Sequence, residues 1–128
     1  MLNHRLMFKV FLSFFVLALL LSSGCTDEKK DNQMIAKKWK QYETSINGQK
    51  LLGEDDPSNI TYNFMPDGKC EVILSSGPQM GEYEILNKSS LQIQAGPANE
   101  MFTIDKLTES ELYLKDRNGT LLKFKPLQ

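Results

Sequence analysis

The chain has 128 residues, of which 41% are hydrophobic and 24% charged, with 15 basic and 16 acidic side chains and a formal net charge of −1. This length supports one small domain around one core. The balanced charge gives no electrostatic footprint for nucleic acid, and two cysteines cannot build a disulfide framework.

The N-terminal residues 1–24 have the layout of a signal peptide. Arg5 and Lys9 give a positive start, an apolar run follows over 10–21, and small residues precede Cys25. The apolar run is well short of the roughly 20 residues that a membrane-spanning helix needs. We therefore expect this segment to be removed rather than kept as a transmembrane anchor.

Cys25 directly follows the small residues Ser22, Ser23 and Gly24. This stretch resembles the lipobox of bacterial lipoproteins, in which the Cys thiol is acylated and the peptide bond before it is cut. The resemblance implies that Cys25 carries several acyl chains, palmitate among them, and two or more chains hold a protein stably at a membrane. Ordinary secretion with a free Cys25 is the alternative.

Residues 25–33 are expected to form the lipidated Cys and a flexible tether, because Thr26–Gln33 contains no apolar residue to bury. Thr26 follows the Cys where Asp would resemble an inner-membrane retention signal, which favours the outer membrane over the inner one. The pair Asp27-Glu28 resembles signals that send some lipoproteins to the cell surface, with a solvated spacer as the alternative. The mature chain keeps 13 basic and 16 acidic residues, a net charge of −3.

Residues 34–126 are predicted to form one domain of short strands joined by turns. A helical turn over 34–37 is expected to lead into a first strand over 39–46, which ends at the turn signal Asn47-Gly48. Seven further runs alternate apolar and polar residues. They lie near 60–64, 70–74, 83–85, 91–93, 102–104, 112–114 and 122–124.

Turn residues separate these runs. Met65–Lys69 contains Pro and Gly and predicts a hairpin, and Asn118-Gly119 suits a tight type I′ turn. Gly77-Pro78 and Gly96-Pro97 are expected to break strands.

The fold class that follows is all-β. Eight strands in succession, with no helix long enough for a parallel crossover, give an antiparallel meander. Closing the meander into a barrel removes its exposed edges. We therefore predict a single small eight-stranded antiparallel up-and-down barrel behind the signal peptide and tether.

Several segments of this domain resemble the small lipocalin-like domains that are common in bacterial lipoproteins. They are the strand of Trp39, ITYNFMPDGKCEV over 60–72, GEYEI over 81–85, IDKLTESELYL over 104–114, and a closing Phe124. The resemblance implies a non-catalytic binding module for a small apolar ligand or a peptide. A module that docks or inhibits a partner protein through its loops, at 48–59 or 75–80, is the alternative.

Six aromatic residues are expected to point into the barrel and are the candidate ligand-binding residues. Such rings bury about 150–250 Å² each and favour a filled barrel with at most a shallow mouth. They are Trp39, Tyr62, Phe64, Tyr83, Phe102 and Phe124.

The sequence offers little for catalysis, and we expect no enzyme, cofactor or metal. The only His in the chain, His4, lies in the leader, so no His-based triad or zinc site remains. No Gly-rich phosphate loop follows a strand. Cys70 falls on the apolar face of its strand, where we expect a buried and inert thiol.

Three polar clusters have a functional and a plain interpretation. Residues 54–56 could offer oxygens to calcium, but an acidic solvated loop is favoured. Residues 116–119 weakly resemble a calcium-binding loop, but they are too few for one, and a hairpin turn accounts for them. The lysines at 37, 38 and 40 could touch lipid headgroups near the anchor, or simply solvate a sheet edge.

Overall fold

The computed structural model describes residues 26–128, and the predictions of a signal peptide and of lipidation at Cys25 lie outside this range. No helix among the described residues is long and apolar enough to cross a membrane. The elements are α2 (Thr26–Ile35), β1 (Lys38–Ile46), β2 (Gln49–Leu52), β3 (Thr61–Phe64), β4 (Lys69–Leu74), β5 (Gly77–Leu86), β6 (Ser90–Ala95), β7 (Ala98–Leu107), β8 (Leu112–Lys115) and β9 (Thr120–Pro126).

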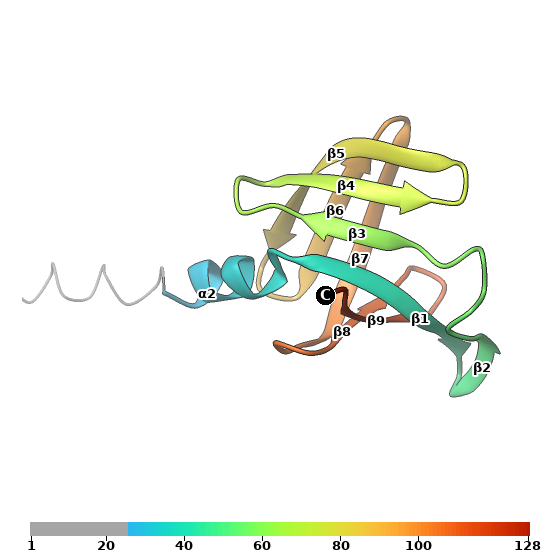
Figure 1. Ribbon diagram of the computed structural model, residues 1–128. Helices are drawn as coiled ribbons and strands as arrows, with labels where there is room; N and C mark the ends of the chain where they lie inside the picture. Colours follow the sequence, from blue (N-terminus) through green and yellow to red (C-terminus); the bar gives the residue numbers. More distant parts are fainter. Residues whose placement is uncertain (1–25) are drawn as a thin grey trace, which may run out of the picture.

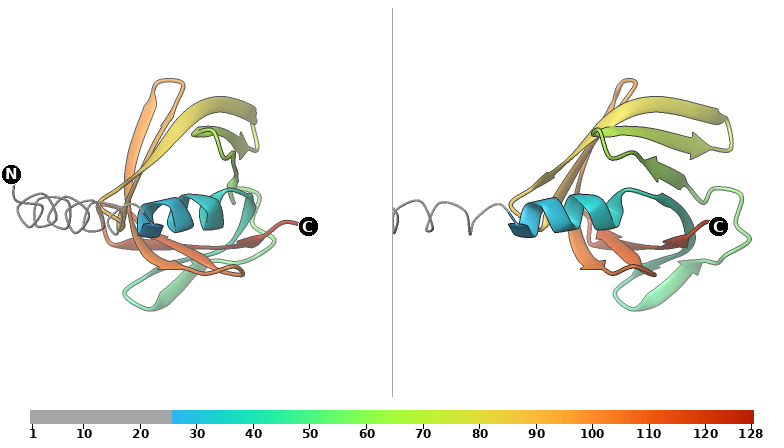
Figure 2. Two further views of the ribbon diagram at one scale, coloured as in Figure 1. Left: turned by 90° about the vertical axis from the view of Figure 1, so that its left-hand side faces the viewer. Right: turned by 60° about the vertical axis from the view of Figure 1, so that its left-hand side comes forward.

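Eight of the strands close into an antiparallel up-and-down barrel (Figures 1 and 2). Neighbours from β3 to β9 follow one another in sequence, and β1 pairs with both β3 and β9, which closes the ring. The alternation of apolar and polar residues therefore predicted the fold class correctly.

Strand β2 is a ninth strand that the sequence did not indicate. It pairs with the C-terminal half of β1, beside the barrel rather than in it, while Lys38–Lys40 at the start of β1 pair with β3. Asn47 and Gly48 between β1 and β2 have positive φ angles of 52° and 78°, as a type I′ turn requires. Because the side chains of Gln49, Lys50 and Leu51 are exposed, β2 carries no alternating pattern.

One turn prediction was wrong, and a second was correct only in part. At Asn118-Gly119 only the glycine has a positive φ, of 81°, so this is no type I′ turn. The Asp116 carboxylate instead accepts hydrogen bonds from the backbone N–H groups of Asn118 and Thr120, at 2.8 and 2.9 Å. The strand β4 does end at Leu74, just before Gly77-Pro78, but Gly77-Pro78 opens β5 instead of lying in a loop, because this part of β5 pairs with β4 alone and leaves one edge free for a proline.

The segment expected to be a flexible tether is helical, since α2 covers Thr26–Ile35. Glu, Lys, Gln and Met in this stretch are good helix formers, and a polar segment rich in them can be helical. Ile35 at the end of the helix is fully buried. The expected helical turn over 34–37 is thus the end of a longer helix.

The α2 end of the barrel is closed. The indole Nε1 of Trp39 donates a hydrogen bond to the backbone carbonyl of Ile35, at 2.9 Å, and both residues are fully buried. The Lys37 ammonium lies 5.2 Å from the centroid of the Trp39 ring and donates to the backbone carbonyl of Glu109. Lys37 therefore packs over this end of the barrel.

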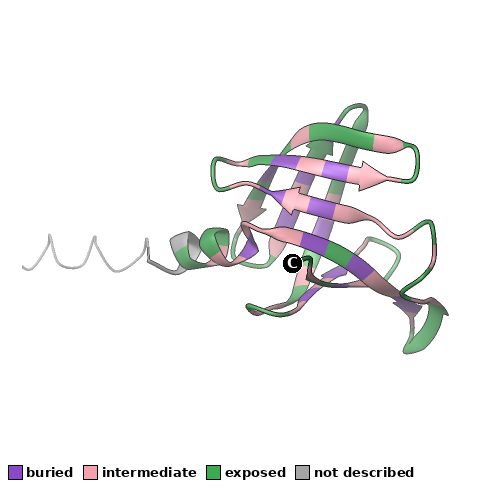
Figure 3. Ribbon diagram, in the orientation of Figure 1, coloured by how far each residue is buried: buried purple, intermediate pink, exposed green. Residues whose placement is uncertain are grey.

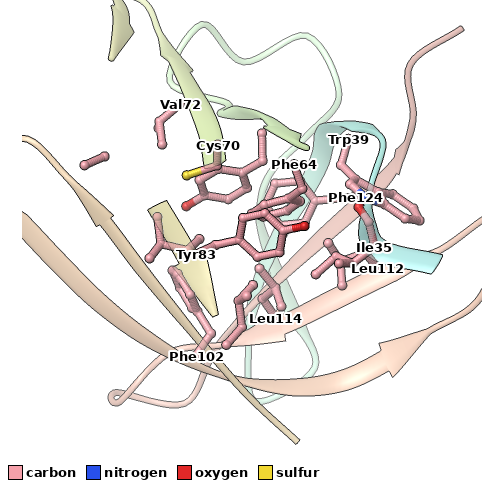
Figure 4. Packing of buried hydrophobic residues seen from close by; sticks show 14 residues of the cluster. Ile35, Trp39, Phe64, Cys70, Val72, Tyr83, Phe102, Leu112, Leu114 and Phe124 are labelled. Carbon is pink, nitrogen blue, oxygen red and sulfur yellow. Dashed lines mark hydrogen bonds between the residues drawn. The ribbon is translucent and has the colours of Figure 1, made fainter. Parts of the chain in front are cut away.

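A single aromatic and aliphatic core fills the barrel from this closed end (Figures 3 and 4). The ring centroids of Phe64 and Tyr83 are 4.8 Å apart, and those of Tyr62 and Phe64 are 5.3 Å apart, within the range of favourable ring contacts. The core residues are Ile35, Trp39, Tyr62, Phe64, Cys70, Val72, Tyr83, Leu91, Ile93, Ala95, Phe102, Leu112, Leu114 and Phe124. All six aromatic residues predicted to point inward are among them.

Candidate functional site

The end of the barrel opposite α2 is an open mouth. A cleft of about 360 Å³ lies there, between the start of β7, the β8–β9 turn and the segment that leads into β3. Its apolar lining is Ile60, Met101, Phe102 and Leu122, and its polar lining is Asn99, Glu100, Asp116, Arg117 and Asn118. An apolar floor with a polar rim is the usual composition of a site for a small molecule.

A smaller pocket of about 70 Å³ lies beside the cleft and shares Ile60 and Glu100 with it. Because these two residues line both cavities, the cavities are neighbours at the mouth. The pocket is lined by Ile60, Tyr62, Val72, Leu74, Gln79, Ile93, Ala95, Ala98 and Glu100.

Two polar side chains at the mouth lie on the inner face of the barrel. Glu100 pairs with Ile93, and Gln79 pairs with Val72, across antiparallel ladders. Residues directly opposite each other in such a ladder project from the same face. Ile93 and Val72 are core residues, so Glu100 and Gln79 also project inward, just beyond the apolar core.

Sequence reasoning missed both of these residues. Glu100 lies two positions before the inward-facing Phe102, so alternation extended by one more step would have placed it on the inner face. The expected strand began only at Phe102, whereas β7 begins at Ala98. Gln79 was assigned to a loop, but it belongs to β5.

The Tyr62 hydroxyl is the one polar group of the pocket that comes from the core. Tyr62 is 1% exposed, and its hydroxyl makes no hydrogen bond to any of the residues 26–128. The Tyr83 hydroxyl, by contrast, donates to the backbone carbonyl of Met65 at 2.6 Å. Burial raises the pKa of Tyr62 well above its ordinary value, and the nearby Glu100 carboxylate raises it further. The phenol is therefore neutral and available to a ligand.

Gln41 holds the segment that leads into β3 in place at the edge of the mouth. Its side-chain carbonyl accepts a hydrogen bond from the backbone N–H of Ile60, at 3.0 Å, and its amide donates to the Thr44 hydroxyl at 2.6 Å. The backbone N–H of Gln41 also donates to the Ile60 carbonyl, at 2.9 Å. Gln41 is 3% exposed and Ile60 is half-buried, so these bonds run from the interior to the mouth and hold Ile60 where it lines both cavities.

The six predicted ring residues divide between the filled part of the barrel and its mouth. Tyr62 lines the small pocket and Phe102 lines the cleft. Trp39, Phe64, Tyr83 and Phe124 line neither of these two cavities and pack in the core. Only the first two are placed to touch a ligand at the mouth.

The other candidate groups have ordinary structural roles. Cys70 is fully buried, and burial raises the pKa of its thiol, which makes it a poor nucleophile. The Glu54 carboxylate pairs with Lys125, which lowers the pKa of Glu54, and Asp56 accepts hydrogen bonds from Ser58. Within residues 26–128, no three His, Cys, Asp or Glu side chains are grouped to hold a metal ion.

Comparison with known proteins addresses the fold. No family model matches the sequence, and no curated protein matches it. A crystal structure of a lipocalin-like protein from Bacteroides uniformis superposes with a TM-score of 0.59 at 19% identity, over 73% of this chain and 98% of that one. The chain has a lipocalin-like fold. An uncharacterized protein from Bacteroides eggerthii gives a TM-score of 0.58 at 17% identity, over 72% of this chain and 98% of that one.

Proposed function

We propose that this protein is a lipid-anchored lipoprotein of the cell envelope whose lipocalin-like barrel binds a small apolar ligand, or an apolar side chain of a peptide, at its mouth. The observation that carries the proposal is the cleft of about 360 Å³, whose apolar floor adjoins a pocket lined by Tyr62, a core residue whose hydroxyl has no hydrogen-bond partner among residues 26–128. Pockets for small ligands have volumes of about 300–1,000 Å³, so the cleft is large enough for such a molecule.

The chemistry of the mouth supports binding without catalysis. Its ionisable groups are Glu100, Asp116, Arg117 and the phenol of Tyr62. The raised pKa of Tyr62 keeps the phenol protonated, and a neutral phenol is a poor nucleophile and a poor general base. Asp116 is engaged with the backbone of its own turn. What these groups offer a ligand is hydrogen bonds and charge.

The position of α2 supports an anchor at Cys25. Thr26, the residue after Cys25, begins α2, and α2 ends at the closed end of the barrel. Acyl chains on Cys25 would therefore attach the barrel by the end that Trp39, Ile35 and Lys37 close, and leave the mouth accessible. The outer membrane is the location we favour, with the mouth exposed either to the periplasm or at the cell surface.

Mass spectrometry of the intact protein tests the binding function. We expect the Cys25→Ala variant, purified without detergent from its own cells, to retain a small molecule. Ala98→Phe in the same background fills the small pocket and should abolish retention. Gln94→Phe is the matched control, because Gln94 is exposed and projects from the outer face of β6, and it should keep the ligand. Co-purification of a protein instead of a small molecule would favour the alternative, in which the barrel docks a partner protein through its loops.

Metabolic labelling with a fatty-acid analogue tests the anchor. The wild-type protein should be labelled and the Cys25→Ala variant should not. Cys70→Ala is the control, because Cys70 is buried in the barrel and its removal should leave the label in place. Equal labelling of wild type and Cys25→Ala would refute acylation at this residue.

A further inference from the structure

We propose that the mouth selects ligands whose polar head donates a hydrogen bond, such as an aliphatic amine or alcohol, and that it discriminates against carboxylates. This inference rests on the proposed binding function and specifies the chemistry of its ligand. It is carried by the inward-facing Glu100 carboxylate and by the unpartnered hydroxyl of Tyr62, which line the same pocket.

Glu100 makes this pocket selective for charge. The carboxylate lines the small pocket as well as the cleft, and it takes part in no hydrogen bond or ion pair with the residues 26–128. The lining of the small pocket contains no basic side chain. Glu100 is exposed at the rim, so a carboxylate head entering the pocket would meet a like charge there, whereas an ammonium or hydroxyl head would donate to Glu100.

Tyr62 and Gln79 supply the remaining polar contacts. The Tyr62 phenol can donate to, or accept from, the head of a ligand, and the Gln79 amide offers both functions from the neighbouring inner face of β5. An alcohol can satisfy Glu100 and Tyr62 together, because a hydroxyl both donates and accepts. The apolar body of the ligand would then lie in the cleft, over Ile60, Phe102 and Leu122.

Arg117 is the cation that could favour an anion instead. It is exposed on the β8–β9 turn and lines the outer cleft, but it is absent from the lining of the small pocket. Asp116 precedes it in the same turn and lines the same cleft, which offsets its charge. The head of a ligand in the small pocket therefore meets Glu100, while Arg117 stays at the rim.

Calorimetric titration of three probes with the same alkyl chain separates these possibilities. Decylamine, decanol and decanoate are titrated near neutral pH into the full-length Cys25→Ala protein. We expect decylamine and decanol to bind at least about tenfold tighter than decanoate, a difference of about 1.4 kcal/mol. Glu100→Gln should reduce this preference. Glu84→Gln is the matched control, because Glu84 is exposed on the outer face of β5, and it should leave the preference unchanged.

Further variants assign the binding to the pocket. Tyr62→Phe should weaken the binding of decanol, and Ala98→Phe should remove the binding of all three probes. Decanoate bound as tightly as decylamine, or bound in a way that Arg117→Ala abolishes, would overturn the selectivity while leaving the binding function intact. If none of the three probes binds, the proposed binding function itself fails.

Discussion

Gly81 lies against Ala95 across the β5–β6 ladder so closely that a side chain has no room. A Cβ atom on Gly81 would stand 2.8 Å from the Cα atom of Ala95 and 2.9 Å from its Cβ atom. Gly81 also pairs with Cys70 on β4, at the point where β5 passes from pairing with β4 to pairing with β6. This close approach turns the sheet at one corner of the barrel.

Gly81→Ala should therefore destabilise the protein. The obstructing atoms belong to backbone and to a buried alanine, which cannot rotate away, so we expect a loss of about 1–3 kcal/mol in the free energy of unfolding. Gly53→Ala is the matched control. The nearest atom to a Cβ there is the Cε of the flexible Lys50 side chain, at 3.6 Å, and unfolding in denaturant should show little change.

Phe64 and Phe102 differ in what surrounds them, although both are core rings. Phe64 is 1% exposed and lies between Tyr62 and Tyr83, so Phe64→Ala should cost about 3–5 kcal/mol through the cavity it leaves. Phe102 borders the open cleft, where water can fill the vacated space, and Phe102→Ala should cost less. Denaturant unfolding of the two variants measures the loss in the free energy of unfolding for each. An equal loss in Phe64→Ala and Phe102→Ala would contradict an open mouth at Phe102.

The barrel could be predicted from sequence because its strands alternate strictly where one face is buried. Tyr62 and Phe64 in β3, or Leu112 and Leu114 in β8, are buried, and the residues between them are not. The alternation of apolar and polar residues is lost where neither face of a strand is buried by apolar side chains. Strand β2 is mostly exposed, and Ala98–Glu100 of β7 lies at the rim, where polar residues face inward.

The candidate site was harder to predict than the fold for the same reason. A polar residue on an inner face, such as Glu100 or Gln79, looks like the end of a strand when only hydrophobic periodicity is considered. The missing hydrogen bond of the Tyr62 hydroxyl depends on what strands distant in sequence place around it. The inward position of these polar residues and the surroundings of the Tyr62 hydroxyl both depend on the register of the paired strands. The alternating pattern of the sequence does not determine that register.

Gln41 should matter for stability although it is polar. Gln41→Leu leaves the backbone N–H of Ile60 without the side-chain oxygen it bonds, and unpaired buried groups of this kind cost about 1–3 kcal/mol. Gln94→Leu on the outer face should change stability far less. Amide hydrogen exchange provides a second readout, because the Ile60 amide should lose protection in Gln41→Leu and keep it in Gln94→Leu.

The two buried tyrosines predict opposite responses to loss of the hydroxyl. Tyr83→Phe removes the hydrogen bond to the Met65 carbonyl and should cost about 0.5–1.5 kcal/mol. Tyr62→Phe removes a hydroxyl that has no partner within the described domain, so stability should stay the same or rise. Thermal unfolding of the ligand-free variants measures both, and a large loss in Tyr62→Phe would mean that its hydroxyl is bonded after all.

Alkaline pH should destabilise the protein in two steps. Burial raises the pKa of the Cys70 thiol and of the Tyr62 phenol in the folded state. In the unfolded chain these groups ionise near about 8.5 and about 10, so above each value the unfolded state binds fewer protons than the folded one. Stability then falls as the pH rises, by at most about 1.4 kcal/mol per pH unit for each group.

Variants that lack the Cys70 thiol or the Tyr62 phenol show which part of the pH dependence each group causes. Cys70→Ala should flatten the pH dependence of the free energy of unfolding that begins near the thiol's unfolded pKa, and Tyr62→Phe should flatten the part that begins near the phenol's. Burial also raises the pKa of Tyr83, and the hydrogen bond with Tyr42 is the first cause of the raised pKa of Tyr113, so some alkaline sensitivity remains in both variants. A slope above pH about 10 that is the same in wild type and Tyr62→Phe would show that the phenol meets water, and that the pocket beside Glu100 is more open than its lining indicates.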